Sequence, residues 1–325
     1  MPASNPFAIA TRFAPNGTDA DNDVPATIVA GYVQDQITLF RQLKLLADVR
    51  YDYFKVDLDD HRTTTPAVDL ARTDHGVSPR AALIWTPIEA VAVYLSYSYA
   101  FLPSGEQLGL ATTTADLAPE TARNYEIGAR WDPWPALSLS AAVFRLNRDD
   151  GRVVDPARPG LFIKTGQTRT DGVELELRGT VTPFWQIFGG YAYLNAYITE
   201  PISSGTTATV AGIIPTGNKI GLVPHNMFAL WNRFTLGAGW ETGLGVLYQS
   251  GYFTSLNNTV HIPGFTRVDG AVYYTLPTFI GGGNARLAVN VENLFNTKYF
   301  PTVDGDNNIS PGAPITAKLT LSATF

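Results

Sequence analysis

Apolar and polar residues alternate along many segments of this chain, and a period of two is the signature of β-strands. In residues 315–325 the odd positions from Ala317 to Phe325 are apolar, while the even positions carry Thr, Lys and Ser. The same alternation appears in residues 43–53, 91–101, 173–178 and 285–294. Charges lie within these segments but on one side only. The segments are therefore expected to be strands with one apolar and one polar face.

Short turns and long polar loops alternate between the expected strands. Short turns are predicted near residues 40–41, 86–89, 132–135, 183–184, 237–239 and 277–283. Long loops rich in Gly, Pro, Asn and Asp are predicted near residues 15–26, 58–77, 102–122, 149–168, 199–222, 251–263 and 295–313. This gives roughly fourteen strands, the first near Phe7 to Phe13, each at least as long as a tilted membrane strand must be. Residues 141–147 alternate less cleanly, and a β-bulge there would explain the mismatch.

This order of turns and loops is typical of an all-β, antiparallel, up-and-down transmembrane barrel. Both chain ends then lie on the short-turn side, which is the periplasm. In a barrel the polar face lines the lumen. The residues predicted to face the lumen are Asp48, Arg50, Glu126, Arg130, Glu174, Glu176, Arg178, Arg267, Asp269, Arg286 and Glu292.

Composition favours the same class. Of 325 residues, 16% are charged, which is below the roughly 25% of soluble domains. No run of about 18 apolar residues could cross a bilayer as a helix. The net charge of -6 and the absence of a basic stripe argue against a nucleic acid partner. The chain has no cysteine, so its redox compartment cannot be inferred from composition.

Aromatic residues predict two belts at the membrane interfaces. Trp85, Trp131, Trp134, Trp185 and Trp240 lie at or beside predicted short turns. Tyr51, Tyr53, Tyr97, Tyr99, Phe101, Tyr248 and Tyr252 lie toward the long loops. The alternative is a soluble sandwich or propeller, but no repeat of about 40–50 residues is found.

Five stretches, in order, resemble a known family. They are PETARNYEIG at 119–128, GQTRTDGVELE at 166–176, IPGFTRVD at 262–269, VENLFNTKY at 291–299 and the PGAP of 311–314 leading into a last strand that ends in Phe. Together they are similar to the TonB-dependent ferric-siderophore receptors. The similarity extends over nearly the whole chain, so residues 1–325 are expected to form one barrel domain, the C-terminal portion of such a receptor.

The resemblance implies a 22-stranded barrel filled by an N-terminal plug domain. Compared with that family, this sequence is expected to lack the plug, roughly eight strands, the export signal and the TonB-contacting segment. Residues 1–6 lack a basic start and an apolar run, so a signal peptide is expected upstream, or the chain is a fragment. Open sheet edges in lipid cost several kcal/mol per unpaired group. The first and last strands must therefore pair with each other or with strands from elsewhere.

No catalytic motif is found, so the chain is predicted not to be an enzyme. His61 and His75 share one predicted loop and could ligate haem or a metal, but solvated loop histidines are far commoner. No resident cofactor or metal is therefore expected. Siderophores arrive with their iron already coordinated, so recognition calls for aromatic and polar groups at the barrel mouth. By position, the expected ligand contacts are Phe101, Tyr252, Phe253, Tyr299 and Phe300.

The sequence therefore favours a receptor that imports a ferric siderophore through the outer membrane of a Gram-negative bacterium. Its expected partners are outer-membrane lipid, the ferric siderophore and, in the full-length receptor, the TonB complex. Two alternatives stay open at this point: a passive porin-like channel, and a non-functional remnant of a disrupted receptor gene.

Overall fold

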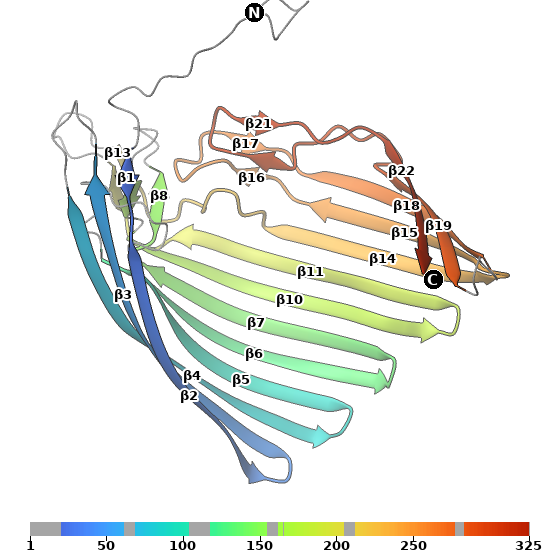
Figure 1. Cartoon of the computed structure of the whole chain (residues 1–325), viewed down its shortest axis with the longest axis horizontal. Helices are drawn as coiled ribbons and strands as arrows, with labels where there is room; N and C mark the ends of the chain where they lie inside the picture. The colour runs from blue at the N-terminus through green and yellow to red at the C-terminus, as the bar shows by residue number, and fades with distance from the viewer. Residues whose placement is uncertain are drawn as a thin grey trace, which may run out of the picture.

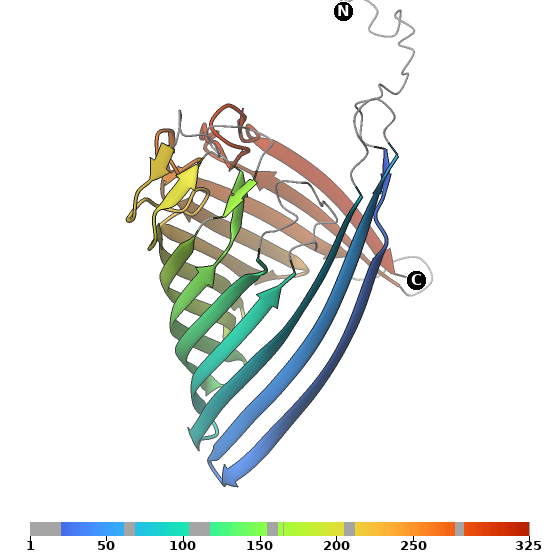
Figure 2. The ribbon, with the colours of Figure 1, turned by 90° about the vertical axis from the view of Figure 1, so that its left-hand side faces the viewer.

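The computed structural model describes residues 21–61, 69–103, 118–154, 162–164, 166–204, 212–276 and 283–324. These residues form strands and connections, and none of them belongs to a helix long and apolar enough to cross a membrane. The main sheet has 14 strands, and every neighbouring pair is antiparallel. It curves into an open trough (Figures 1 and 2).

The strands of the main sheet are Asn22–Asp23 (β1), Ala26–Phe40 (β2), Leu43–Asp60 (β3), Leu70–Ile88 (β4), Val91–Leu102 (β5), Glu120–Trp134 (β6), Leu137–Asp149 (β7), Gln167–Thr182 (β10), Trp185–Ile198 (β11), Asn226–Gly237 (β14), Trp240–Gln249 (β15), Phe265–Leu276 (β18), Asn284–Glu292 (β19) and Thr316–Thr324 (β22). Four two-stranded ribbons rise from the long loops: Arg152–Val154 with Phe162–Lys164 (β8, β9), Ile202–Ser204 with Gly212–Ile214 (β12, β13), Tyr252–Phe253 with His261–Ile262 (β16, β17) and Thr302–Val303 with Ile309–Ser310 (β20, β21).

The strands β1 and β2 act as one. Asn22 pairs with Asp60 and Ala26 with Val56, so the register on β3 continues across the break between them. Pro25 lies in the break, because proline has no N–H to donate to a ladder. The number of strands agrees with the roughly fourteen expected, and with β1 and β2 counted as one strand it is thirteen.

Both edges of the sheet are open in the described part of the chain. There β2 pairs only with β3, and β22 pairs only with β19. Each edge strand runs from a long loop toward the short-turn side, so the two edges point in the same direction and cannot pair antiparallel with each other. The strand expected near residues 7–13, which would have reversed this parity, lies outside the described residues.

Two expectations about the strands are wrong. Residues 58–77 were expected to be a loop, yet Leu58 pairs with Leu70 and Asp52 pairs with Gly76, because pairing across the hairpin overrides a locally polar sequence. A bulge was expected within residues 141–147, yet β7 pairs with β10 without a shift along its whole length. Alternation is blurred there because Phe144 is apolar on the polar face and Arg145 is charged on the apolar face.

The two faces of the sheet can be traced because register partners point the same way. One row runs from Glu176 through Gly190, Ala229 and Leu247 to Arg267. We call the side of this row the polar face, and all the residues predicted to face the lumen, from Asp48 to Glu292, fall on it. The opposite side, which carries Leu95, Ile127 and Leu175, is the apolar face.

Aromatic side chains form two sets on the apolar face. Beside the short turns, Trp85, Trp131 and Trp240 are exposed, and the Trp240 ring lies 4.6 Å from that of Tyr274. Toward the long loops, the rings of Tyr97 and Tyr125 lie 5.1 Å apart. These positions match the two interfacial belts that the sequence suggests.

Candidate ligand-binding face and loop framework

Charges on the polar face pair mainly with neighbours on the same or an adjacent strand. Arg50 Nη2 lies 2.7 Å from Asp52, two residues along β3. Arg130 pairs in the same way with Asp132 at 2.8 Å. These guanidinium groups are about half exposed, so each pair contributes little to stability. They line the polar face with paired and partly exposed charges.

Two grooves hollow the polar face. One, of about 490 Å³, is lined by Tyr94, Glu126, Glu174 and Glu176 among others, and the Tyr94 hydroxyl donates to Glu126 Oε1 at 2.5 Å. The other, of about 760 Å³, lies over β2 to β5 nearer the long loops. It is the larger of the two grooves, and its two arginines are balanced by two aspartates, whereas the lining of the first groove includes three glutamates and no arginine or lysine.

The larger groove combines charge with aromatic surface. Its wall carries Arg50 and Asp52, and Arg80 with Nε 3.3 Å from Asp48 Oδ2. The ring of Phe101 closes one end, where it covers Gly76, since a Cβ on that glycine would lie 2.5 Å from the ring. Phe101, predicted as a ligand contact, therefore lines this groove together with Arg50 and Arg80, although its register partner Thr121 belongs to the outward row of Asp149.

The loops that follow β11, β15 and β19 are tied to one another, and we call them the loop platform. Asn258 joins the first two: its Oδ1 accepts from Lys219 N at 2.7 Å, and its Nδ2 donates to Lys219 O at 2.9 Å. Below this contact, Ile198, Ile214 and Leu256 form a buried cluster. The platform thus has a small core of its own above the sheet.

Asp306 ties the third loop to the second. The Thr254 hydroxyl donates to Asp306 Oδ1, and Asn257 and Thr259 donate to Oδ2 at 3.4 Å. The Thr254 hydrogen bond, aided by Ser255, Asn257 and Thr259, lowers the pKa of Asp306 although partial burial opposes the shift. Asp306 therefore stays ionised and holds the two loops together at neutral pH.

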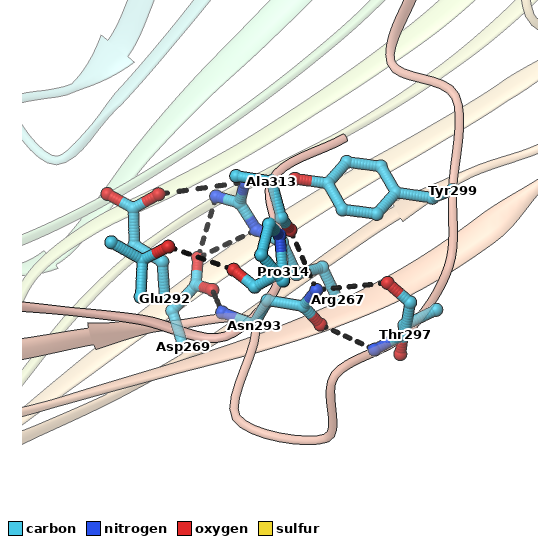
Figure 3. A network of polar contacts seen from close by, with 9 residues as sticks. Arg267, Asp269, Glu292, Asn293, Thr297, Tyr299, Ala313 and Pro314 are labelled. Atoms are coloured by element: carbon cyan, nitrogen blue, oxygen red, sulfur yellow. Dashed lines mark hydrogen bonds and ion pairs between the residues drawn. The ribbon is translucent and has the colours of Figure 1, made fainter. Parts of the chain in front are cut away.

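Asn293 anchors the third loop to the sheet (Figure 3). It is 1% exposed and has φ of 55°, a left-handed conformation that asparagine tolerates. Its N–H donates to Asp269 at 2.8 Å, and its side chain accepts from Thr297 N and donates to Thr297 O and Ala313 O. The stretch around Asn293 that carries the family resemblance is thus a loop anchor.

Tyr299 packs into the same anchor (Figure 3). Its ring lies 4.6 Å from Phe265, and its hydroxyl accepts from Arg267 Nη1 at 3.1 Å. Tyr299 is 7% exposed and Tyr252 is 6% exposed, and burial raises the pKa of Tyr252. The rings of both residues, which were expected to contact a ligand, are therefore buried inside the loop platform.

Phe253 and Phe300 remain accessible among the expected contacts. Phe253 is half-buried, with its ring 5.3 Å from that of His261, and Phe300 is 38% exposed. The residues that the sequence reasoning missed are the polar anchors Asn258, Asn293 and Asp306. An Asn or Asp in a Gly- and Pro-rich loop is a general turn signal, so only the fold separates an anchor from an ordinary turn residue.

The histidines show no metal-binding arrangement. His75 lies within β4 and not in a loop with His61, and its outward position separates it from the polar face. Among the described residues, no group of three or more His, Asp or Glu side chains could hold a metal ion.

The sequence model of the protein family described as "TonB dependent receptor-like, beta-barrel" matches residues 3–294. The chain belongs to this family. A probable TonB-dependent siderophore receptor, PiuA of Acinetobacter baumannii, is 28% identical over 310 residues, which are 92% of this chain and 40% of that protein. The ferrioxamine receptor of Yersinia enterocolitica is 30% identical over 271 residues, covering 82% of this chain and 36% of that protein.

Solved structures agree on the fold of this family member. The crystal structure of PiuA from A. baumannii matches with a TM-score of 0.82 at 24% identity, over 93% of this chain and 43% of that one. The closed form of the ferric-catecholate import receptor Fiu from E. coli matches with a TM-score of 0.75 at 22% identity, over 93% of this chain and 45% of that one. The chain thus spans about two-fifths of the length of the relatives it matches.

Proposed function

We propose that this chain is the C-terminal barrel portion of an outer-membrane receptor that imports a ferric siderophore into a Gram-negative bacterium. Energy would come through TonB, by way of the part of a full-length receptor that this chain does not span. The observation that carries the proposal is the two-faced sheet. An apolar face with two aromatic belts suits lipid, and a charged, hollowed face suits a lumen.

The open edges support a receptor over a closed pore. In hydrocarbon, each unpaired N–H or C=O along β2 and β22 would cost several kcal/mol, so the edges need partner strands. Since the two edges run in the same direction, an odd number of further strands would close an antiparallel barrel. The remaining strands of a longer receptor barrel would supply these partners for β2 and β22.

The ligand would meet the larger groove and the loop platform. Arg50 and Arg80 supply cations and Phe101 an aromatic surface, a combination suited to an anionic metal chelate. Phe253 and Phe300 would contact the ligand from the platform. Tyr252 and Tyr299 would act indirectly, because they hold the loops in place.

The decisive measurement is uptake of radioactive iron, presented with a panel of siderophores, by iron-starved cells that express the full-length protein. Uptake should need both one ferric siderophore and TonB. Phe101→Ala should raise the half-saturating concentration of that siderophore about tenfold, the order of effect expected when an aromatic contact worth about 1.4 kcal/mol is lost. Phe184→Ala, at a short turn, is the matched control and should leave uptake unchanged.

Conductance across liposomes that contain the protein tests the alternative, a passive pore. If the protein forms a steady channel that ferric siderophores do not change, and iron uptake is independent of TonB, it is a passive pore and the proposal fails. The isolated chain should form no steady channel, because β2 and β22 each have a neighbour on one side only among the described residues.

A further inference from the structure

Charged residues gather on the apolar side of the sheet at the long-loop ends of β6, β7, β10 and β11, apart from Asp35 on β2 and the Lys55–Asp57 pair on β3, which also point outward. Arg145 pairs in register with Tyr125 on one side and Asp171 on the other, and Asp171 pairs with Asn195. All of them therefore point away from the polar face. With the next positions along the strands they form what we call the outer polar band: Arg123, Arg145, Asn147, Asp149, Arg169, Asp171, Asn195, Tyr197 and Lys219.

The outer polar band is held in place by its own contacts. Arg145 Nε donates to Asp171 Oδ1 at 2.6 Å, and Arg123 pairs with Asp149. The other two cations rest on neutral groups. Arg169 Nε donates to Asn147 at 3.0 Å, and Lys219 Nζ donates to Asn195 at 2.8 Å and lies 5.8 Å from the centre of the Tyr197 ring.

The charge of the band is opposite to that of the chain. Four cations face two carboxylates, which leaves the band with an excess of two positive charges, whereas the whole sequence has a net charge of -6. The guanidinium side chains of Arg145 and Arg123 are 52% and 42% exposed. Arg145 contacts Asp171 through Nε and Arg123 contacts Asp149 through Nη2, so each exposed guanidinium group has further N–H donors with which to contact a group outside the protein.

The height of the band is fixed by the residues next to it. Two positions nearer the short turns, the outward residues are Val143 before Arg145, Val173 after Asp171 and Tyr193 before Asn195. Two residues of strand cover about 7 Å. The band thus begins in the row of Tyr97 and Tyr125, where the apolar surface ends, and this row corresponds to the interfacial layer of a bilayer.

We propose that the outer polar band binds the phosphate groups of lipid headgroups in the leaflet on the long-loop side. Planar guanidinium groups match phosphate oxygens in a two-point geometry, and the lysine and asparagine groups add single donors. The partner is a lipid and not a soluble anion, because the band continues a face that is itself built for lipid. The inference rests on the proposed membrane location and is independent of siderophore transport, since the band lies on the opposite face from the grooves.

The test uses the folded full-length protein in a neutral detergent, titrated with short-chain phosphatidylglycerol or phosphatidylcholine and followed by native mass spectrometry. The wild type should bind phosphatidylglycerol at least tenfold more tightly than phosphatidylcholine. R145Q/R169Q should lose this preference, and R145K/R169K should keep most of it. R50Q/R130Q, which removes two arginines from the polar face, is the matched control and should keep the preference.

Three results would overturn the proposal: no preference in the wild type, an unchanged preference in R145Q/R169Q, or an equal loss in R50Q/R130Q. Folding of each variant is checked by its heat-dependent shift in electrophoretic mobility. Iron uptake by R145Q/R169Q should equal that of the wild type. Failure of siderophore uptake in the wild type would therefore reject the transport proposal without affecting the lipid measurement, and the reverse also holds.

Discussion

Two regions stand above the belt of tyrosines, and they are stabilised by different means. The tall hairpin, formed by residues 54–60 of β3 and 70–76 of β4, extends the sheet directly (Figure 2). It carries an apolar cluster of Phe54, Val56 and Leu58, with Val24 and Leu70 packed against it. The loop platform has only short ribbons, and side chains such as Asn258, Asn293 and Asp306 bind its backbone and hydroxyl groups.

The difference follows from where backbone hydrogen bonds go. In the tall hairpin the strand ladder satisfies the N–H and C=O groups, so only the side chains need partners and apolar packing supplies them. In the loop platform most backbone groups lie outside a ladder, so amide and carboxylate side chains must satisfy them. We therefore expect the hairpin to be sensitive to loss of volume and the platform to loss of single polar groups.

The largest effect is expected at Asn293. Asn293→Ala removes three side-chain hydrogen bonds and leaves a left-handed residue without its local partner, so the third loop should open more easily by about 3 kcal/mol. Hydrogen exchange at the Thr297 amide measures this opening. Asn307→Ala, an exposed asparagine of the same loop, should have no effect. If the Thr297 amide were equally protected from exchange in both variants, the loop platform would not depend on single polar side chains as proposed.

In the tall hairpin the expected effect is smaller. Val56 is 0% exposed, so Val56→Ala should cost about 2 kcal/mol through lost burial and the cavity left behind. Faster hydrogen exchange in residues 54–60, with the platform unchanged, is the expected result. Val49→Ala, on the lipid side of the same strand, serves as the control. If Val56→Ala loosened the platform as well, the two regions would be one cooperative unit.

The smallest effect is expected at Asp306 and depends on pH. Its pKa is lower in the folded protein than in the unfolded chain, so the carboxylate stabilises the platform above the unfolded value of about 3.9. That stability is lost as the pH falls through the lower, folded pKa. The protection factor of the Thr254 amide, which is the exchange rate of an unstructured chain divided by that of the amide at the same pH, should therefore be constant from pH 5 to 8 and fall below about pH 4.

Asp306→Asn should weaken the contact at pH 7 by about 1 kcal/mol, as for one lost charge-assisted hydrogen bond, and should remove the acid dependence. Asp304→Asn, in the same loop, should leave the acid dependence intact. An acid response that survives in Asp306→Asn would place the titrating group elsewhere and leave Asp306 as an ordinary polar contact.

The sequence was a good guide wherever the information is local. Alternation in residues 91–101 and 315–325 identifies both the strands and their faces, because successive side chains of a strand point to opposite sides whatever its neighbours are. It failed at residues 70–77, where a polar stretch is held as strand by pairing with β3. It also failed at Arg145, whose charge on the apolar face suggested a bulge that the ladder does not contain.

In the candidate site, too, the sequence correctly placed some residues near the loops and could not predict the burial of others. Composition and position placed Phe101, Phe253 and Phe300 near the mouth, and these rings are at least partly accessible. The same reasoning could not foresee that Tyr252 and Tyr299 are buried, because their partners come from other loops, as Arg267 and Phe265 do for Tyr299.

By itself, then, the sequence determined an antiparallel sheet with one face for lipid and one for a lumen, since side-chain direction along a strand is a property of the chain alone. Only the tertiary structure decided which loop residues anchor, which tyrosines are covered, where the edges remain open and where cations point outward. Each of these depends on register between segments far apart in the sequence, and no single segment carries that information.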